Sequence, residues 1–159
     1  MKKYCLLLLC WIVLAGCAQK GTPPEAEFAD ASQITAKWKE TVFTVTVTDT
    51  GCKFSFDAPE TLRALTLVYD GKKMTADCNG LVTEVPTLFA KGILPFYRGV
   101  LACKSHTWQN AEEGIRRITL DGETFLLYYD PAGECITRLE VKGAEGTAEY
   151  EILSCIKSE

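Results

Sequence analysis

Side chains of the kinds that catalysis or metal binding requires are few in this sequence, and they stand apart from one another. His106 is the single histidine, so neither a histidine-rich zinc site nor a Ser-His-Asp triad can be assembled. Cys103 precedes His106 by three positions, a spacing that suits half of a metal site or an activated thiol. Because no second pair of ligands follows at such a spacing, we interpret this run as a helix end entering a polar loop.

Two further patterns also lack what their chemistry needs. Glu112 and Glu113 are paired carboxylates, which acid–base catalysis uses. Adjacent side chains in a loop point apart, however, and Arg116 and Arg117 follow closely enough to neutralise them. Gly71, Gly122 and Gly133 stand at expected hairpins and form no phosphate-binding motif. We therefore predict no catalytic residue, no metal, no cofactor and a protein that is not an enzyme.

The first sixteen residues have the pattern of an export signal. A basic start (MKK) precedes an apolar run at 4–14, which is shorter than the roughly 20 residues of a membrane-spanning helix. Residues 14–17, LAGC, resemble the lipobox of bacterial lipoprotein signal peptides. This resemblance implies that 1–16 are removed and that Cys17 begins the mature chain, carrying a diacylglycerol and acyl chains such as palmitate. The alternative is a plain secretory signal followed by an unrelated cysteine.

A lipidated Cys17 would hold the protein on the extracytoplasmic face of the cell membrane, because two or three acyl chains anchor stably. Residues 17–31 contain glycine, two prolines and alternating charges, and we interpret them as a flexible tether before a domain at 32–159. The net charge is −4, and removal of a signal with two lysines makes the remainder more acidic. We expect a membrane partner and no nucleic acid, since phosphate binding needs a basic surface.

Five of the eight cysteines fall in the expected domain: Cys52, Cys78, Cys103, Cys135 and Cys155. An odd number leaves at least one thiol without a partner in the chain. Cys52 and Cys135 share strand parity with apolar neighbours, and we interpret both as small core residues. If a disulfide forms, we expect it between Cys78 and Cys103, where it would close the loop that carries the helix. A reducing exterior would instead leave all five as thiols.

Runs of alternating apolar and polar residues from Ile34 onward predict an antiparallel sheet. In VFTVTVT at 42–48, Phe43 and two valines share one face and the threonines share the other. Short turns such as Asp70-Gly71 separate the runs, so neighbouring strands must pair antiparallel. The expected strands are 42–48, 52–57, 62–69 and 72–78 in one meander, and 114–120, 123–129, 134–141 and 147–156 in a second.

A strong helical candidate, 86–103, lies between the two meanders. Pro86 suits a first turn, and apolar residues recur after it at helical spacing. Pro95 lacks a backbone donor, so we expect a kink or two half-helices at 92–95. The wide apolar surface of this segment must be covered, most simply by the concave face of a curled sheet.

This order of elements resembles the LolA-like fold of the periplasmic lipoprotein-carrier superfamily. The resemblance rests on FSFDAP at 54–59, the leucine-rich run at 62–67, the YDG hairpin at 69–71 and the helix that follows, and it spans most of 34–156. It implies an α+β, mainly β fold: a curled antiparallel half-barrel around one kinked apolar helix, with a concavity that receives acyl chains. The chain departs from the carriers in its own lipidation signal and its short length, which argue against shuttling.

Ten apolar residues are candidates for lining such a cavity: Trp38, Phe43, Phe54, Phe56, Phe89, Ile93, Phe96, Tyr97, Val100 and Trp108. The same residues suit a close-packed core, so the volume of the interior separates the two interpretations. The first hypothesis is a membrane-anchored, non-enzymatic lipoprotein that binds an apolar ligand or a lipid acyl chain between sheet and helix. The alternative is a protein-interaction lipoprotein that uses a sheet face or edge as partner or regulator of an envelope or cell-wall enzyme.

Overall fold

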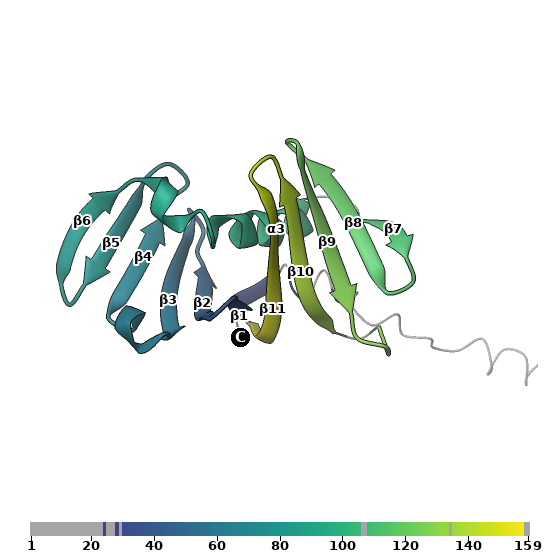
Figure 1. The fold of residues 1–159 in the computed structure, drawn as a ribbon, viewed down its shortest axis with the longest axis horizontal. Helices are drawn as coiled ribbons and strands as arrows, with labels where there is room; N and C mark the ends of the chain where they lie inside the picture. The colour runs from purple at the N-terminus through teal and green to yellow at the C-terminus, as the bar shows by residue number, and fades with distance from the viewer. Residues whose placement is uncertain (1–23, 25–27, 29, 106–107, 134, 158–159) are drawn as a thin grey trace, which may run out of the picture.

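The computed structural model describes residues 24, 28, 30–105, 108–133 and 135–157. They form an eleven-stranded antiparallel sheet in the order β6-β5-β4-β3-β2-β1-β11-β10-β9-β8-β7 (Figure 1). Two meanders, β1 to β6 and β7 to β11, therefore meet at the centre of the sheet, where the first strand pairs with the last. The sheet is curled and open, with β6 and β7 as its two edges.

The first meander follows the alternation read from the sequence. In β2 the buried side chains are those of Phe43 and Val45, while the intervening threonines are more exposed. A 3-10 turn, η1 (Glu60–Leu62), follows Pro59 and shortens the strand expected at 62–69. The strands are β1 (Ala31–Trp38), β2 (Thr41–Val47), β3 (Cys52–Ala58), β4 (Leu65–Tyr69), β5 (Met74–Cys78) and β6 (Leu81–Val85).

The second meander is built in the same way. Two-residue turns such as Asp121-Gly122, whose φ angles are 51° and 81°, make three of its connections, and a longer turn at 130–135 joins β9 to β10. In β9, Phe125 and Leu127 are buried and face the core. The strands are β7 (Gln109–Glu112), β8 (Ile115–Leu120), β9 (Glu123–Tyr129), β10 (Ile136–Gly143) and β11 (Gly146–Lys157).

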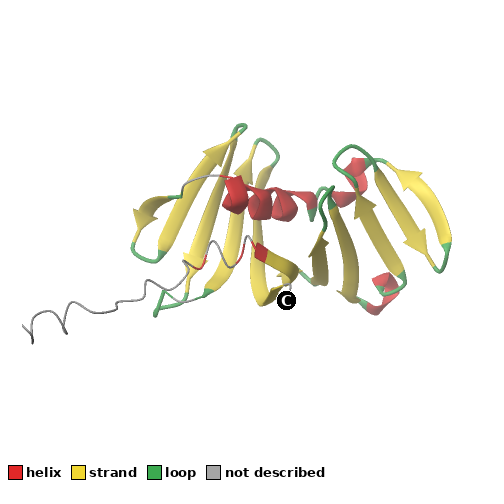
Figure 2. Cartoon of the chain, turned by 180° about the vertical axis from the view of Figure 1, so that it is seen from behind, coloured by secondary structure: helices red, strands yellow, loops and turns green. Residues whose placement is uncertain are grey.

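An interrupted helix connects the two edges of the sheet. A 3-10 segment, η2 (Thr87–Ala90), is followed by a turn at 91–93 and by α3 (Leu94–Ser105). Pro95 stands in the first turn of α3, where a missing backbone N–H removes no helical hydrogen bond. The predicted interruption at 92–95 is thus confirmed, although the segment before it is a 3-10 helix and not an α-helix. α3 runs across the strands rather than along them, as views from both sides show (Figures 1 and 2).

The core lies between α3 and the concave face of the sheet. Phe96 is fully buried, and its ring contacts those of Phe28, Phe43 and Tyr150 edge-on at centroid distances of 6.2, 5.4 and 5.2 Å. Gly99 permits close packing on β10, because a Cβ atom there would lie 2.6 Å from the side chain of Leu139. The predicted fold class, α+β and mainly β with a curled antiparallel sheet around a kinked apolar helix, is confirmed.

Several elements differ from the sequence prediction. Strands β6 and β7, at the two edges, were not predicted; β7 (QNAE) is polar throughout and carries no apolar alternation. β1 begins at Ala31, and Phe28 is buried against Phe96, so the end of the predicted tether packs on the domain. Cys135 is exposed rather than in the core, because β10 begins only at Ile136, beside a register shift.

Some predictions fall outside the described residues. These are the signal at 1–16, the lipidation site Cys17 and His106, and the side chain of Phe89 is likewise not described. Within the described ranges, no helix has both the length and the apolar character that crossing a bilayer requires.

Candidate functional site

The structure places most of the predicted cavity residues in the packed core, and it places Trp38 beside the open space described below. The ring of Phe43 contacts those of Phe54 and Phe96 edge-on, with centroids 6.3 and 5.4 Å apart. Seven of the candidates are at most 7% exposed: Phe43, Phe54, Phe56, Ile93, Phe96, Tyr97 and Val100. Phe28 and Tyr150, which sequence reasoning did not include, occupy the space among these rings. The interior is therefore filled at this point, and none of the seven lines either of the two clefts described below.

Open space lies instead at the start of α3. A cleft of about 950 Å³ is bounded by the first turns of α3, the β8–β9 turn, the β10–β11 hairpin and the end of β1. We call it the α3 cleft. Its apolar lining comes from Trp38, Leu94, Pro95, Val141, Ala144 and Ala148, and its charged lining from Lys39, Lys91, Arg98, Asp121, Glu123 and Glu145. A smaller cleft of about 460 Å³ shares Trp38, Lys39 and Thr147 with it.

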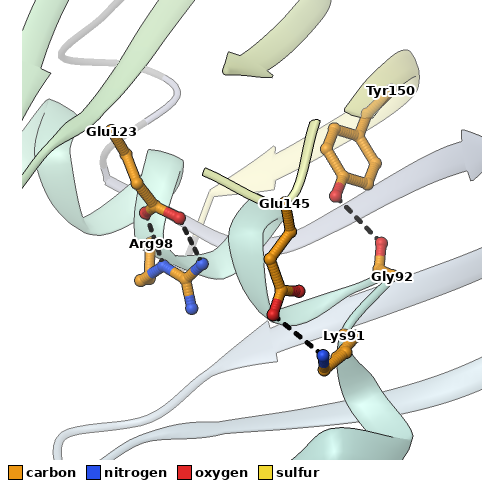
Figure 3. A network of polar contacts seen from close by, with 6 residues as sticks. All are labelled: Lys91, Gly92, Arg98, Glu123, Glu145 and Tyr150. Atoms are coloured by element: carbon orange, nitrogen blue, oxygen red, sulfur yellow. Dashed lines mark hydrogen bonds and ion pairs between the residues drawn. The ribbon is translucent and has the colours of Figure 1, made fainter. Parts of the chain in front are cut away.

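Close backbone packing fixes one wall of the α3 cleft. Gly92 lies so near Trp38 that a Cβ atom would come within 2.2 Å of the indole ring. The hydroxyl of Tyr150, in β11, donates a hydrogen bond of 2.9 Å to the carbonyl of Gly92 (Figure 3). Burial raises the pKa of Tyr150, so the phenol stays protonated and remains a donor. Strands β1 and β11 thus hold the segment before α3 in place.

Two ion pairs connect the helical segment to the hairpins around the cleft. Arg98 donates to both carboxylate oxygens of Glu123 at 2.7 and 2.6 Å, a bidentate arrangement. Lys91 donates to Glu145, at the β10–β11 hairpin, at 2.8 Å. Figure 3 shows both pairs beside the Tyr150 contact. The rim therefore contains two ion pairs, in which opposite charges neutralise each other. The apolar side chains of the lining lie between these pairs.

This arrangement suits the binding of a small molecule. No group of three or more His, Cys, Asp or Glu side chains in the described ranges is arranged to hold a metal ion. The cleft volume falls within the roughly 300–1,000 Å³ of small-molecule sites. A ligand with an apolar part could contact Trp38, Leu94 and Val141 and place polar groups at the charged rim. Sequence reasoning named Trp38 as a cavity aromatic but missed Leu94 and Val141; Gly143 and Gly146, which line the cleft in the β10–β11 hairpin, were the available signal.

The structure separates the two cysteines of the expected disulfide. Cys78 is exposed at the end of β5, and Cys103 is buried near the end of α3, with no disulfide between them. Helix α3 places Cys103 within electrostatic range of Tyr129 in β9. Cys78 lies in the other meander, where β5 pairs with β4 and β6. Burial raises the pKa of Cys52 to about 12 and raises that of Cys103 as well, so neither is an activated nucleophile.

Outside the cleft, Glu140 is a buried carboxylate whose hydrogen-bond and ion-pair partners are side chains of β9 and β10. Burial alone would raise its pKa, but a hydrogen bond of 2.5 Å from Tyr128 and another from Lys142 leave the pKa below its ordinary value. The guanidinium of Arg138 stacks on the Tyr128 ring at 3.7 Å. This network is satisfied internally, and we assign it to the stability of β9 and β10.

Similarity of this chain to known proteins is found among solved structures. No protein-family model matches the chain, and no curated protein matches it. Among solved structures, the chain is similar to the LolA superfamily protein NE2245 from Nitrosomonas europaea, with a TM-score of 0.39 and 6% sequence identity. That similarity covers 87% of this chain and 95% of the other.

Proposed function

We propose that this protein is a non-enzymatic lipoprotein of the cell envelope whose domain binds a ligand with an apolar part, such as a lipid acyl chain, between sheet and helix. The observation that supports this function is the α3 cleft, an open space of about 950 Å³ with an apolar lining and a charged rim. The binding region differs from the one expected from sequence. It lies at the start of α3, beside Leu94 and Pro95, rather than among the aromatic rings below the helix.

The membrane anchor is the second part of the proposal. The LAGC run at 14–17 supports cleavage before Cys17 and lipidation of its thiol, which would keep the domain at the extracytoplasmic face of the membrane. Mass spectrometry of the mature protein is expected to find an acylated N-terminal Cys17, and the Cys17→Ala variant should carry no acyl chain. An unmodified mature N-terminus at another residue would reject the anchor without touching the binding proposal.

Ligand binding is tested by filling the cleft. Ala148 is half-buried in β11 and lines the cleft, so Ala148→Trp should occupy the space and weaken binding of a fluorescent fatty acid at least tenfold. Ala132 lies in the exposed β9–β10 turn at the other end of β10, and Ala132→Trp is the matched control with unchanged binding. Native mass spectrometry of the purified protein should also show bound lipid. Absence of lipid together with no fatty-acid binding would overturn the proposal.

The packed interior favours a second candidate, a protein-interaction lipoprotein that is partner or regulator of an envelope or cell-wall enzyme. Because the interior is filled around Phe43 and Phe96, a partner would bind to the outer surface of the domain, such as a sheet face or edge. Co-purification from native membranes should recover one enzyme at a stoichiometric ratio, whose activity changes when the purified chain is added. If fatty acid binds and no such enzyme appears, the first function stands alone.

A further inference from the structure

The two open edges of the sheet differ in how they are protected against pairing with another strand. β7 (Gln109–Glu112) is short and polar, and its register with β8 shifts between Asn110 and Glu112. Such irregularity and polarity are the usual devices that keep an edge strand unpaired. β6 (Leu81–Val85) has neither device. It pairs with β5 in unbroken register and contains no lysine, proline or bulge.

β6 also carries the two most exposed large apolar side chains of the described residues. Leu81 is 74% exposed and Val82 is 62% exposed. They are adjacent in the strand, so they project from opposite faces of the sheet. Leu81 and Val85 lie on the face that continues into the core, since their partners across β5 are Cys78 and the fully buried Met74.

The β5–β6 hairpin determines which backbone groups of β6 face outward. Its loop is the two-residue turn Asn79-Gly80, with φ of 54° and 85°, and Cys78 pairs with Leu81 across it. The residues that flank such a turn form a hydrogen-bonded pair, and the pairs alternate along the hairpin. The backbone groups of Leu81, Thr83 and Val85 therefore point to β5, and those of Val82 and Glu84 point away from it.

We propose that β6 pairs antiparallel with β6 of a second copy of this chain, about a two-fold axis at Thr83. In this register Val82 and Glu84 exchange backbone hydrogen bonds with Glu84 and Val82 of the copy. On the core-side face Leu81 lies opposite Val85 of the copy, and Thr83 lies opposite Thr83, which is a favourable cross-strand pair. Each residue pairs with a residue that pairs back with it, as a two-fold interface requires.

Charge favours this register over its neighbour. A shift that put Glu84 opposite Glu84 of the copy would place like charges together, which destabilises a strand pair. In the proposed register Glu84 lies opposite Val82, and its carboxylate is already paired with Lys73 of its own chain at 3.0 Å. A joint between five-residue strands is small beside the roughly 1,200–2,000 Å² of stable interfaces, so the dimer is a weak one that forms at high local concentration.

Disulfide trapping tests the register directly. In full-length chain whose exposed Cys78, Cys135 and Cys155 are replaced by serine, Thr83→Cys would place two thiols opposite each other at the axis. Directly opposed residues of a non-hydrogen-bonded pair have Cα atoms about 4.5 Å apart, a separation that a disulfide spans. Mild oxidation should give a covalent dimer on a non-reducing gel. Asn110→Cys on the protected edge is the matched control, and the triple-serine parent gives the background.

A charge pair supplies a second measurement. Val82→Glu would place a carboxylate opposite Glu84 at two symmetric positions, and the yield of trapped Thr83→Cys dimer should fall on the order of tenfold. Val82→Lys, opposite the same Glu84, should keep or raise the yield. Equal trapping by Thr83→Cys and Asn110→Cys, equal losses with both charges at position 82, or trapping of Thr83→Cys only to other proteins would each overturn the proposal. None of these results bears on the α3 cleft.

Discussion

Helix α3 borders two regions of different character, the core below its buried face and the cleft at its first turn. In the core, Phe96 meets aromatic rings from three other segments edge-on. At the cleft, Trp38, Leu94 and Val141 lie among glycines, alanines and charged side chains. Large apolar residues therefore occur in both regions, and the open region differs by the small residues and ion pairs beside them.

The largest expected effect tests the filled region. Phe96→Ala removes a fully buried ring with three ring contacts, and we expect a loss of about 3–5 kcal/mol in the free energy of unfolding. Urea denaturation followed by circular dichroism measures it. Leu101→Ala, in the same helix but 39% exposed, is the control and should cost clearly less. Equal losses would mean that the interior is looser than the ring contacts indicate.

Gly92→Ala tests the boundary between the two regions. The new methyl group would lie 2.2 Å from the Trp38 ring, so the indole must move out of its place beside the cleft. We expect a loss of about 1–3 kcal/mol and a change in tryptophan fluorescence. Gly143→Ala also borders the cleft, but it meets only the flexible Glu123 side chain at 3.4 Å. It should leave both readouts nearly unchanged, and a similar effect from both variants would contradict the assigned wall.

Alkaline pH should weaken the core before it affects the cleft. Burial raises the pKa of the Cys52 thiol from its ordinary 9.0 to about 12. As pH rises from 9 to 12, the unfolded chain loses this proton first, so the contribution of Cys52 to stability falls by up to about 1.4 kcal/mol per pH unit, in addition to that of Cys103, whose pKa burial also raises. Urea unfolding at pH 8, 9, 10 and 11 measures the slope. Cys52→Ala should reduce it, and an unchanged slope would show that Cys52 is not the titrating group.

The smallest effect concerns the rim of the cleft. Arg98 and Glu123 form a bidentate pair, but their side chains are 47% and 24% exposed, so Arg98→Gln should cost only about 0.2–1 kcal/mol. The difference from wild type should shrink in 1 M salt, where charges are screened. Arg63→Gln, at an exposed 3.9 Å pair, is the control with no measurable change. A larger, salt-independent loss in the free energy of unfolding would contradict this expectation. It would mean that the pair fixes the β8–β9 hairpin against α3 rather than contributing only a weak surface interaction.

Sequence pattern was sufficient for the architecture and insufficient for the site. Alternation in β2 and β9 and the helical spacing after Pro86 are local signals, and the strands and the interrupted helix follow them. Phe28, Tyr150 and Trp38 acquire their roles only through contacts with residues far away in the chain. The edge strand β6 shows a third case, since its five residues become a strand through the Asn79-Gly80 turn and not through alternation.

The pairing of β1 with β11 has a consequence for how the protein is made. Ala31 is the partner of Lys157, so the central joint of the sheet uses residues from the two ends of the domain. Contacts between such distant positions form slowly, because the entropic cost of closing a long loop comes before the contacts can stabilise the chain. During synthesis, each meander must wait as a separate sheet with an unpaired strand until the last residues arrive. Loss of the final strand would therefore leave two exposed halves rather than a slightly smaller domain.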